Sequence, residues 1–135
     1  NDSGAFNQPL WKDPETGIEY KMRKDEKGNP LEEDALKLSK GISDFLKLIR
    51  KHNPKARICW IWGMISLPEI SPYIQKGVDM FISETGDKNT DTMILDGMEC
   101  EKYLEDKGSR GHPGPLTHLL ASRKIKKYIE VHSSF

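Results

Sequence analysis

The fold of this chain is decided by one apolar stretch, Ala56-Arg57-Ile58-Cys59-Trp60-Ile61-Trp62-Gly63. β-Branched and aromatic residues dominate the stretch, so it predicts a β-strand. Because the strand is apolar for most of its length, we expect it to be covered on both faces, as strands of a parallel sheet are. Helices on either side of the strand in the sequence would then complete an α/β architecture.

An amphipathic helix is predicted before this strand, and Pro54 ends it. Its apolar residues recur at spacings of four and three, which places them on one stripe of a helix. The stripe consists of Leu31, Ala35, Leu38, Ile42, Phe45, Leu46 and Ile49. The charged residues expected to face water are Glu32, Glu33, Lys37, Lys40, Asp44, Lys47 and Arg50.

Two more helices and a second strand follow. A helix is predicted to begin at Leu67-Pro68-Glu69-Ile70 and to end near Gly86, and the second strand is expected at 92–95. A short helix is predicted at 100–104, and the last helix starts near Pro115. The apolar residues of that last helix are Leu116, Leu119, Leu120, Ile125, Tyr128 and Ile129. Strands joined through helices predict a parallel, doubly wound sheet with helices in layers around it.

Two strands are fewer than such a sheet needs. Stable sheets have about four to six strands. We therefore expect residues 1–135 to be the C-terminal portion of a single domain, with the first strands upstream of Asn1 or on another chain.

The composition excludes several classes of partner and cofactor. Among 135 residues, Lys plus Arg and Asp plus Glu both number 21, so the formal charge of +0 disfavours nucleic acid and anionic membranes as partners. The longest apolar run, 58–67, is far shorter than the roughly 20 residues of a membrane helix. The two cysteines, Cys59 and Cys100, lack metal-ligand spacing, and no glycine loop for a phosphate or a dinucleotide is present, so neither metal nor cofactor is expected. We expect Cys59 to be a buried free thiol, and the compartment, secreted or cytoplasmic, stays open.

A loop rich in glycine and proline, Ser109-Arg110-Gly111-His112-Pro113-Gly114-Pro115-Leu116-Thr117-His118, leads into the last predicted helix. In an open α/β sheet, ligands bind beyond the carboxyl ends of the strands, where such loops gather. An imidazole in this place accepts a hydroxyl proton and returns it, which makes His112 a candidate general base. The alternative is a structural or surface histidine, as we expect for His118, His52 and His132.

The segment from His112 to His118 resembles the last sequence block of the SGNH (GDSL-like) hydrolases, in which Asp-x-x-His-Pro precedes a second histidine at the start of the final helix. Asn1-Asp2 resembles the end of that family's Gly-x-Asn-Asp block. The helix that ends at 53–56 before an apolar strand is similar to the family's middle segment. The resemblance implies a three-layer α/β/α flavodoxin-like fold with a parallel sheet, of which 1–135 supplies the C-terminal half.

The same resemblance implies a serine esterase. His112 would activate the serine, and Asn1 would donate its side-chain amide to an oxyanion hole. The nucleophilic serine would lie in a Gly-Asp-Ser block, which this sequence does not contain. Ser3 is not expected to replace it, because Ser3 runs into Gly4 and a polar loop instead of opening a helix.

Position 109 departs from the family pattern, which places there the carboxylate that orients the histidine. Ser109 stands in that position, so the role falls to a backbone carbonyl, to another acid such as Asp96 or Glu99, or to no group. This departure, together with Gly111-His112-Pro113 and Trp62-Gly63-Met64, resembles carbohydrate esterase family two. That likeness implies a Ser-His dyad that removes acetyl groups from plant cell-wall sugars. The alternatives are a non-catalytic carbohydrate- or ligand-binding module that keeps the fold, and a flavodoxin-like ligand-binding domain with an incidental His-Pro loop.

Two tryptophans are candidate substrate-binding residues. Trp62 lies near the carboxyl end of the first strand, where an aromatic ring stacks on a sugar or else belongs to the core, as we expect for Trp60. Trp11 lies in a long polar loop or insertion at 7–30, which also contains Tyr20. Such a loop forms the wall of a binding cleft or is a solvated insertion.

Overall fold

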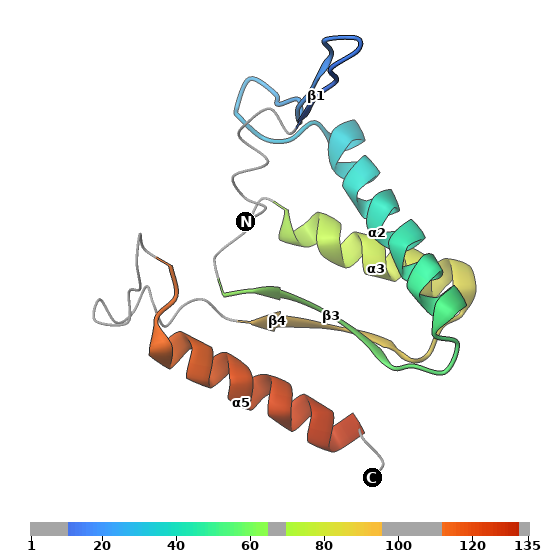
Figure 1. Ribbon diagram of the computed structural model, residues 1–135, viewed down its shortest axis with the longest axis vertical. Helices are drawn as coiled ribbons and strands as arrows, with labels where there is room; N and C mark the ends of the chain where they lie inside the picture. The colour runs from blue at the N-terminus through green and yellow to red at the C-terminus, as the bar shows by residue number, and fades with distance from the viewer. Residues whose placement is uncertain (1–10, 65–69, 96–111, 133–135) are drawn as a thin grey trace. The chain divides into compact units, whose positions relative to one another are not determined.

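The computed structural model describes residues 11–64, 70–95 and 112–132 (Figure 1). The chain forms two compact units. The first comprises Asn1–Ile58 and Leu67–Thr90, and the second comprises Cys59–Ser66 and Asp91–Phe135. The short helix predicted at 100–104 lies outside the described residues.

The first unit is built around two helices, α2 (Glu32–His52) and α3 (Ser71–Thr85), which lie side by side (Figure 1). Acidic residues open α2 and basic residues close it, in the sense that the helix dipole favours. Gly86 ends α3 in the left-handed conformation, and its amide donates to the carbonyl of Ile82. The buried apolar residues of the pair are Ala35, Ile42, Leu46, Ile70, Ile74, Val78 and Phe81.

The buried side of α2 differs from the predicted stripe. Phe45, predicted to be on the apolar stripe, is 51% exposed, whereas Ser39 and Ser43 are buried. Ser39 is accommodated because its hydroxyl donates to the carbonyl of Tyr73 over 2.7 Å. Gly77 allows this close approach of the two helices.

Replacing Gly77 with alanine is expected to destabilise the protein. A Cβ at this position would lie 2.7 Å from both the Ile42 Cβ and the carbonyl oxygen of Ser39. Overpacking of this kind costs about 1–3 kcal/mol. The matched control is Gly41→Ala, because Gly41 lies within α2 with nothing near a new Cβ, and there alanine should stabilise by about 0.5–1 kcal/mol. Urea unfolding of the two variants checks both signs, and equal shifts would contradict the close approach at Gly77.

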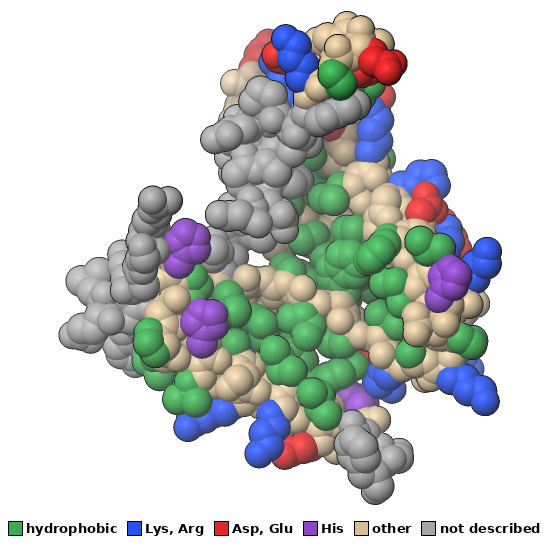
Figure 2. Space-filling model, in the orientation of Figure 1, with side chains coloured by type: hydrophobic (Ala, Val, Ile, Leu, Met, Phe, Trp, Pro, Cys, Tyr) green, Lys and Arg blue, Asp and Glu red, His purple; other side chains and the backbone are tan. Residues whose placement is uncertain are grey.

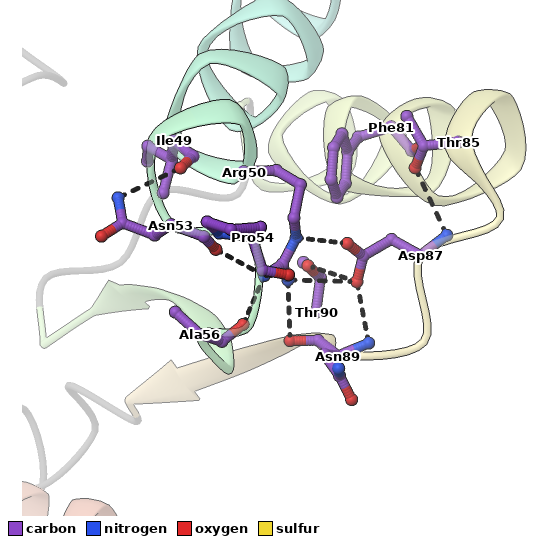
Figure 3. A network of polar contacts seen from close by, with 10 residues as sticks. All are labelled: Ile49, Arg50, Asn53, Pro54, Ala56, Phe81, Thr85, Asp87, Asn89 and Thr90. Atoms are coloured by element: carbon purple, nitrogen blue, oxygen red, sulfur yellow. Dashed lines mark hydrogen bonds and ion pairs between the residues drawn. The ribbon is translucent and has the colours of Figure 1, made fainter.

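Arg50 connects the ends of both helices of the first unit to the segments that lead into the strands (Figure 3). Its guanidinium donates to both carboxylate oxygens of Asp87, at 2.6 and 3.3 Å, and to the carbonyls of Asn53, Ala56 and Asn89. The sequence predicted that Arg50 faces water, and this is wrong, since the side chain is only 17% exposed. The signal was missed because its partners lie far away in the sequence.

The predicted loop at 7–30 contains a small hairpin. The strands β1 (Trp11–Lys12) and β2 (Glu19–Tyr20) pair antiparallel, with Trp11 opposite Tyr20. The backbone amide and the guanidinium of Arg23 donate hydrogen bonds to the carboxylate of Asp34, and these bonds hold the segment against the start of α2. Hydrogen bonds from Arg23 hold the pKa of the Asp34 carboxyl well below its ordinary value, so the anchor persists to low pH.

The second unit contains most of β3 (Ile58–Gly63) and β4 (Thr90–Leu95), which pair with each other, and α5 (Pro115–His132). The amide of Ile58 donates to the carbonyl of Asn89, and the amide of Met64 donates to that of Leu95. Both bonds join residues with the same sequence separation, so a step forward along β3 is matched by a step forward along β4. The two strands therefore run parallel. A parallel strand pair with α3 between its strands in the sequence confirms the predicted α/β class, and the number of layers stays a prediction.

Burial along β3 is less complete than predicted. Ile61 is 39% exposed, and Trp60 and Cys59 are partly buried. Trp62 is the buried tryptophan, at 9% exposed, whereas the sequence favoured Trp60 for the core. Cys59 is a free cysteine, as predicted, but it is not fully buried.

The buried side of α5 also differs from the prediction. Leu116, Leu119 and Ile129 are exposed, and hydrophobic side chains are visible along α5 in Figure 2. Thr117 is the buried residue of the helix, and Leu120, Ile125 and Tyr128 of the predicted stripe are partly buried. Lys124 and Tyr128 join α5 to β4 through side-chain hydrogen bonds.

Candidate functional site

The position of α5 follows from two hydrogen bonds to β4. The Tyr128 hydroxyl donates to the carboxylate of Asp91 at 2.6 Å, and Lys124 Nζ donates to the carbonyl of Ile94 at 2.6 Å. The residue later in α5 therefore meets the earlier residue of β4. Because α5 runs opposite to β4, its first turn lies toward the carboxyl end of that strand, as Figure 1 shows.

His112 lies in the short segment directly before the first turn of α5. Pro115 is the first residue of the helix, where its fixed φ is suitable and its missing amide costs nothing. The carbonyl of Gly114 accepts from the amide of His118, which completes the first turn. Gly114 and Thr117 are buried, whereas His112 is exposed. The imidazole is thus carried on a short anchored segment and is accessible to a ligand.

The carboxyl end of β3 lies at the same edge. Gly63 has φ 116° and Met64 has φ 65°, so the chain leaves the strand through two residues with positive φ. The amide of Met64 donates to the carbonyl of Leu95, the last residue of β4, at 2.7 Å. A Cβ on Gly63 would overlap that same carbonyl. The two strand ends are therefore held tightly together.

These features put the segment that carries a candidate general base directly before the first turn of α5, which lies toward the carboxyl end of β4. This edge is where open α/β sheets bind ligands. An exposed imidazole there is suited to moving a proton between a hydroxyl group and a leaving group. Within residues 11–64, 70–95 and 112–132, no group of three His, Cys, Asp or Glu side chains is placed to hold a metal ion.

The other predicted site residues are only partly located. Asn1 and Ser109 lie outside the described residues, as do Asp96 and Glu99. Trp11 lies in β1, and its side chain is likewise not described.

Trp62 belongs to β3, next to Gly63, and exposes little surface for stacking on a sugar ring. Its role in substrate binding stays a prediction, as does that of His112 in catalysis. Met64 was noted in the sequence only as part of Trp62-Gly63-Met64, and its left-handed backbone was missed because nothing in the local sequence indicates a positive φ at a methionine.

None of the described helices is both long and apolar enough to cross a membrane. Exposed basic side chains of α5, among them Arg123, Lys126 and Lys127, face solvent. The described part of the chain thus gives no sign of a membrane-spanning segment.

No protein-family model matches the chain, and no curated protein matches it either. Among solved structures, the chain is similar to an acetyl xylan esterase, Est2A, from the rumen bacterium Butyrivibrio proteoclasticus. The two are 34% identical with a TM-score of 0.82, and the match covers 96% of this chain and 33% of that chain. The chain therefore spans about a third of the length of the esterase, and over almost all of its own length it has an esterase-like α/β fold.

Proposed function

We propose that the protein is a serine esterase of the SGNH type that hydrolyses carboxylic esters, chiefly acetyl esters on carbohydrate. The observation that carries the proposal is the 34% identity to an acetyl xylan esterase over 96% of this chain. The exposed His112 agrees with it, since it precedes the helix turn that lies toward the carboxyl end of β4, and a general base belongs at such an edge.

In this proposal residues 1–135 supply the C-terminal portion of the domain. The nucleophilic serine lies outside this sequence, in the preceding part of the domain or on another chain. His112 takes the proton of the serine hydroxyl while the serine oxygen attacks the ester carbonyl. The Asn1 side-chain amide donates to the resulting oxyanion, an interaction worth on the order of 3 kcal/mol in the transition state.

The reaction then proceeds in two steps, release of the alcohol and hydrolysis of the acyl-enzyme. Collapse of the first tetrahedral intermediate breaks the bond to the sugar oxygen, and His112 returns the proton to that oxygen. Water replaces the alcohol, loses a proton to His112 and attacks the acyl-enzyme. The second collapse releases the carboxylic acid and restores the serine hydroxyl.

The orientation of His112 is assigned to a dyad and not to a triad. The hydroxyl of Ser109 does not stabilise an imidazolium as a carboxylate does. In a dyad the ring is held by a backbone carbonyl or by no group, whereas an acid such as Asp96 or Glu99 in that role would complete a triad. Trp62 and Trp11 are proposed as sugar-contacting residues on the strength of their aromatic rings.

A serine-directed fluorophosphonate tests the proposal in the intact protein. We expect stoichiometric labelling of one serine outside residues 1–135, located by peptide mapping, and loss of labelling in His112→Ala. Labelling of Ser3 would refute the assignment of the nucleophile. Absence of labelling, together with saturable binding of acetylated xylooligosaccharide, would instead identify a non-catalytic binding module.

A further inference from the structure

Met64 has an unusual backbone conformation. It is the one non-glycine residue with positive φ, at 65°, among those that the structure describes. A side chain in this left-handed region costs on the order of 1–3 kcal/mol unless the surroundings hold it there. The hydrogen bond from its amide to Leu95 supplies that restraint.

A turn alone does not account for a methionine at this position. Glycine adopts the left-handed conformation without strain, and the chain already uses it at Gly17, Gly28 and Gly86. Methionine adds strain that glycine would avoid, and strained backbone of this kind gathers at functional sites. The residue directly before it, Gly63, has no room for any side chain.

The location of Met64 indicates which kind of site this is. It follows β3 at the carboxyl edge, bonded to the end of β4, and α5 brings His112 toward the same edge within one unit. Met64 as a residue is partly buried, so it lies between the core and the surface. Backbone strain that persists in such a place points to a binding function.

Resting on the proposed esterase activity, we infer that Met64 is a specificity-determining residue that forms one wall of the pocket for the acyl group. The acyl chain is the apolar part of the substrate, whereas the alcohol is a polar sugar, so a thioether matches the acyl side. Its bulk limits the pocket to a short acyl group such as acetyl. One methylene in an apolar pocket changes kcat/KM about 10–200-fold, which is enough to set this preference.

The variants Met64→Gly and Met64→Ala separate the backbone effect from the side-chain effect. Both remove the thioether, but only alanine keeps a Cβ in the left-handed conformation. The intact protein and its variants are assayed with p-nitrophenyl acetate and p-nitrophenyl butyrate, and Tm is measured for each. Met64→Leu, of similar volume, serves as the conservative control.

We expect both small variants to raise the butyrate-to-acetate ratio of kcat/KM about tenfold, and Met64→Leu to keep the ratio of the wild type. Met64→Gly should melt roughly 2–4 °C above Met64→Ala, since it alone relieves the strain. A purely structural role would move Tm without moving the ratio.

The outcomes distinguish the two proposals. A wild type without ester turnover, or one that keeps turnover in His112→Ala, overturns the proposed function and the role of Met64 with it. An active wild type with an inactive His112→Ala, but with unchanged acyl preference in both small variants, overturns the role of Met64 alone.

Discussion

Replacing His112 with alanine is expected to lower kcat/KM for p-nitrophenyl acetate by about 10²–10⁴-fold. General-base catalysis contributes roughly 10²–10⁴-fold, and in the proposed mechanism His112 is the group that takes the proton of the serine hydroxyl. Because His112 is exposed on the loop before α5, its loss should leave folding intact. Steady-state kinetics with circular dichroism on the same sample measure both effects.

His118→Ala is the matched control for this experiment. Both histidines are exposed, and His118 lies in the first turns of the same helix, where its backbone amide and not its ring completes the turn. We expect its kcat/KM to stay within a factor of about two of the wild type, as for a surface substitution. Equal losses in the two variants would remove His112 from its proposed role.

The helices and strands of this chain could be predicted from local signals. Pro54 marked the end of α2, which stops at His52, and Gly86 marked the left-handed end of α3. The β-branched and aromatic run gave β3 within two residues of its observed start at Ile58. These features depend on residues near each other in the sequence, so they can be predicted without knowledge of the fold.

The way in which the helices and strands pack against one another could not be predicted from such local signals. Ser39 is buried because Gly77, on another helix, lets α2 and α3 approach and because the carbonyl of Tyr73 accepts its hydroxyl. Lys124 contacts β4 although its charge predicts a solvent-facing position. Binary hydrophobic patterns miss such contacts, since each depends on a partner that is distant in the sequence.

In the candidate site, too, features set by local sequence were predictable and features set by distant partners were not. His112 was identifiable because glycine and proline restrict the loop around it and the last helix follows directly. The left-handed Met64 was not, since its conformation depends on the carbonyl of Leu95 at the end of the other strand. Asn1 and Ser109 lie outside the described residues, so their roles stay predictions.

Arg50→Ala is expected to destabilise the protein by about 3 kcal/mol, the largest effect on stability that we predict. Removing one partner of a buried ion pair leaves the other charge unpaired. Here Arg50 and Asp87 are 17% and 8% exposed, and the guanidinium also serves the carbonyls of Asn53, Ala56 and Asn89. Arg50→Lys should lose part of this stability too, because an ammonium lacks the planar fork that reaches these acceptors together.

Lys40→Ala provides the control on the same helix. Lys40 forms an ion pair with Asp44 at 2.7 Å, but the two side chains are 68% and 50% exposed. Exposed pairs contribute about 0.2–1 kcal/mol, so this variant should unfold close to the wild type in urea at pH 7. Comparable destabilisation by the Arg50 and Lys40 variants would contradict the connecting role of Arg50.

The pH dependence of the unfolding free energy tests whether the Arg50–Asp87 ion pair causes the destabilisation of Arg50→Ala. Burial raises the pKa of Asp87, but hydrogen bonds from Arg50, Asn89 and Thr90 outweigh it, so the pKa lies below its ordinary value. The stability that such a carboxylate contributes is present above its unfolded pKa, near 3.9, and is lost as the pH falls through the lower folded value. The difference in unfolding free energy between the wild type and Arg50→Ala should therefore be largest at pH 7 and shrink toward pH 3. A difference that does not change with pH would mean that Arg50 stabilises the unit through its carbonyl contacts and not through Asp87.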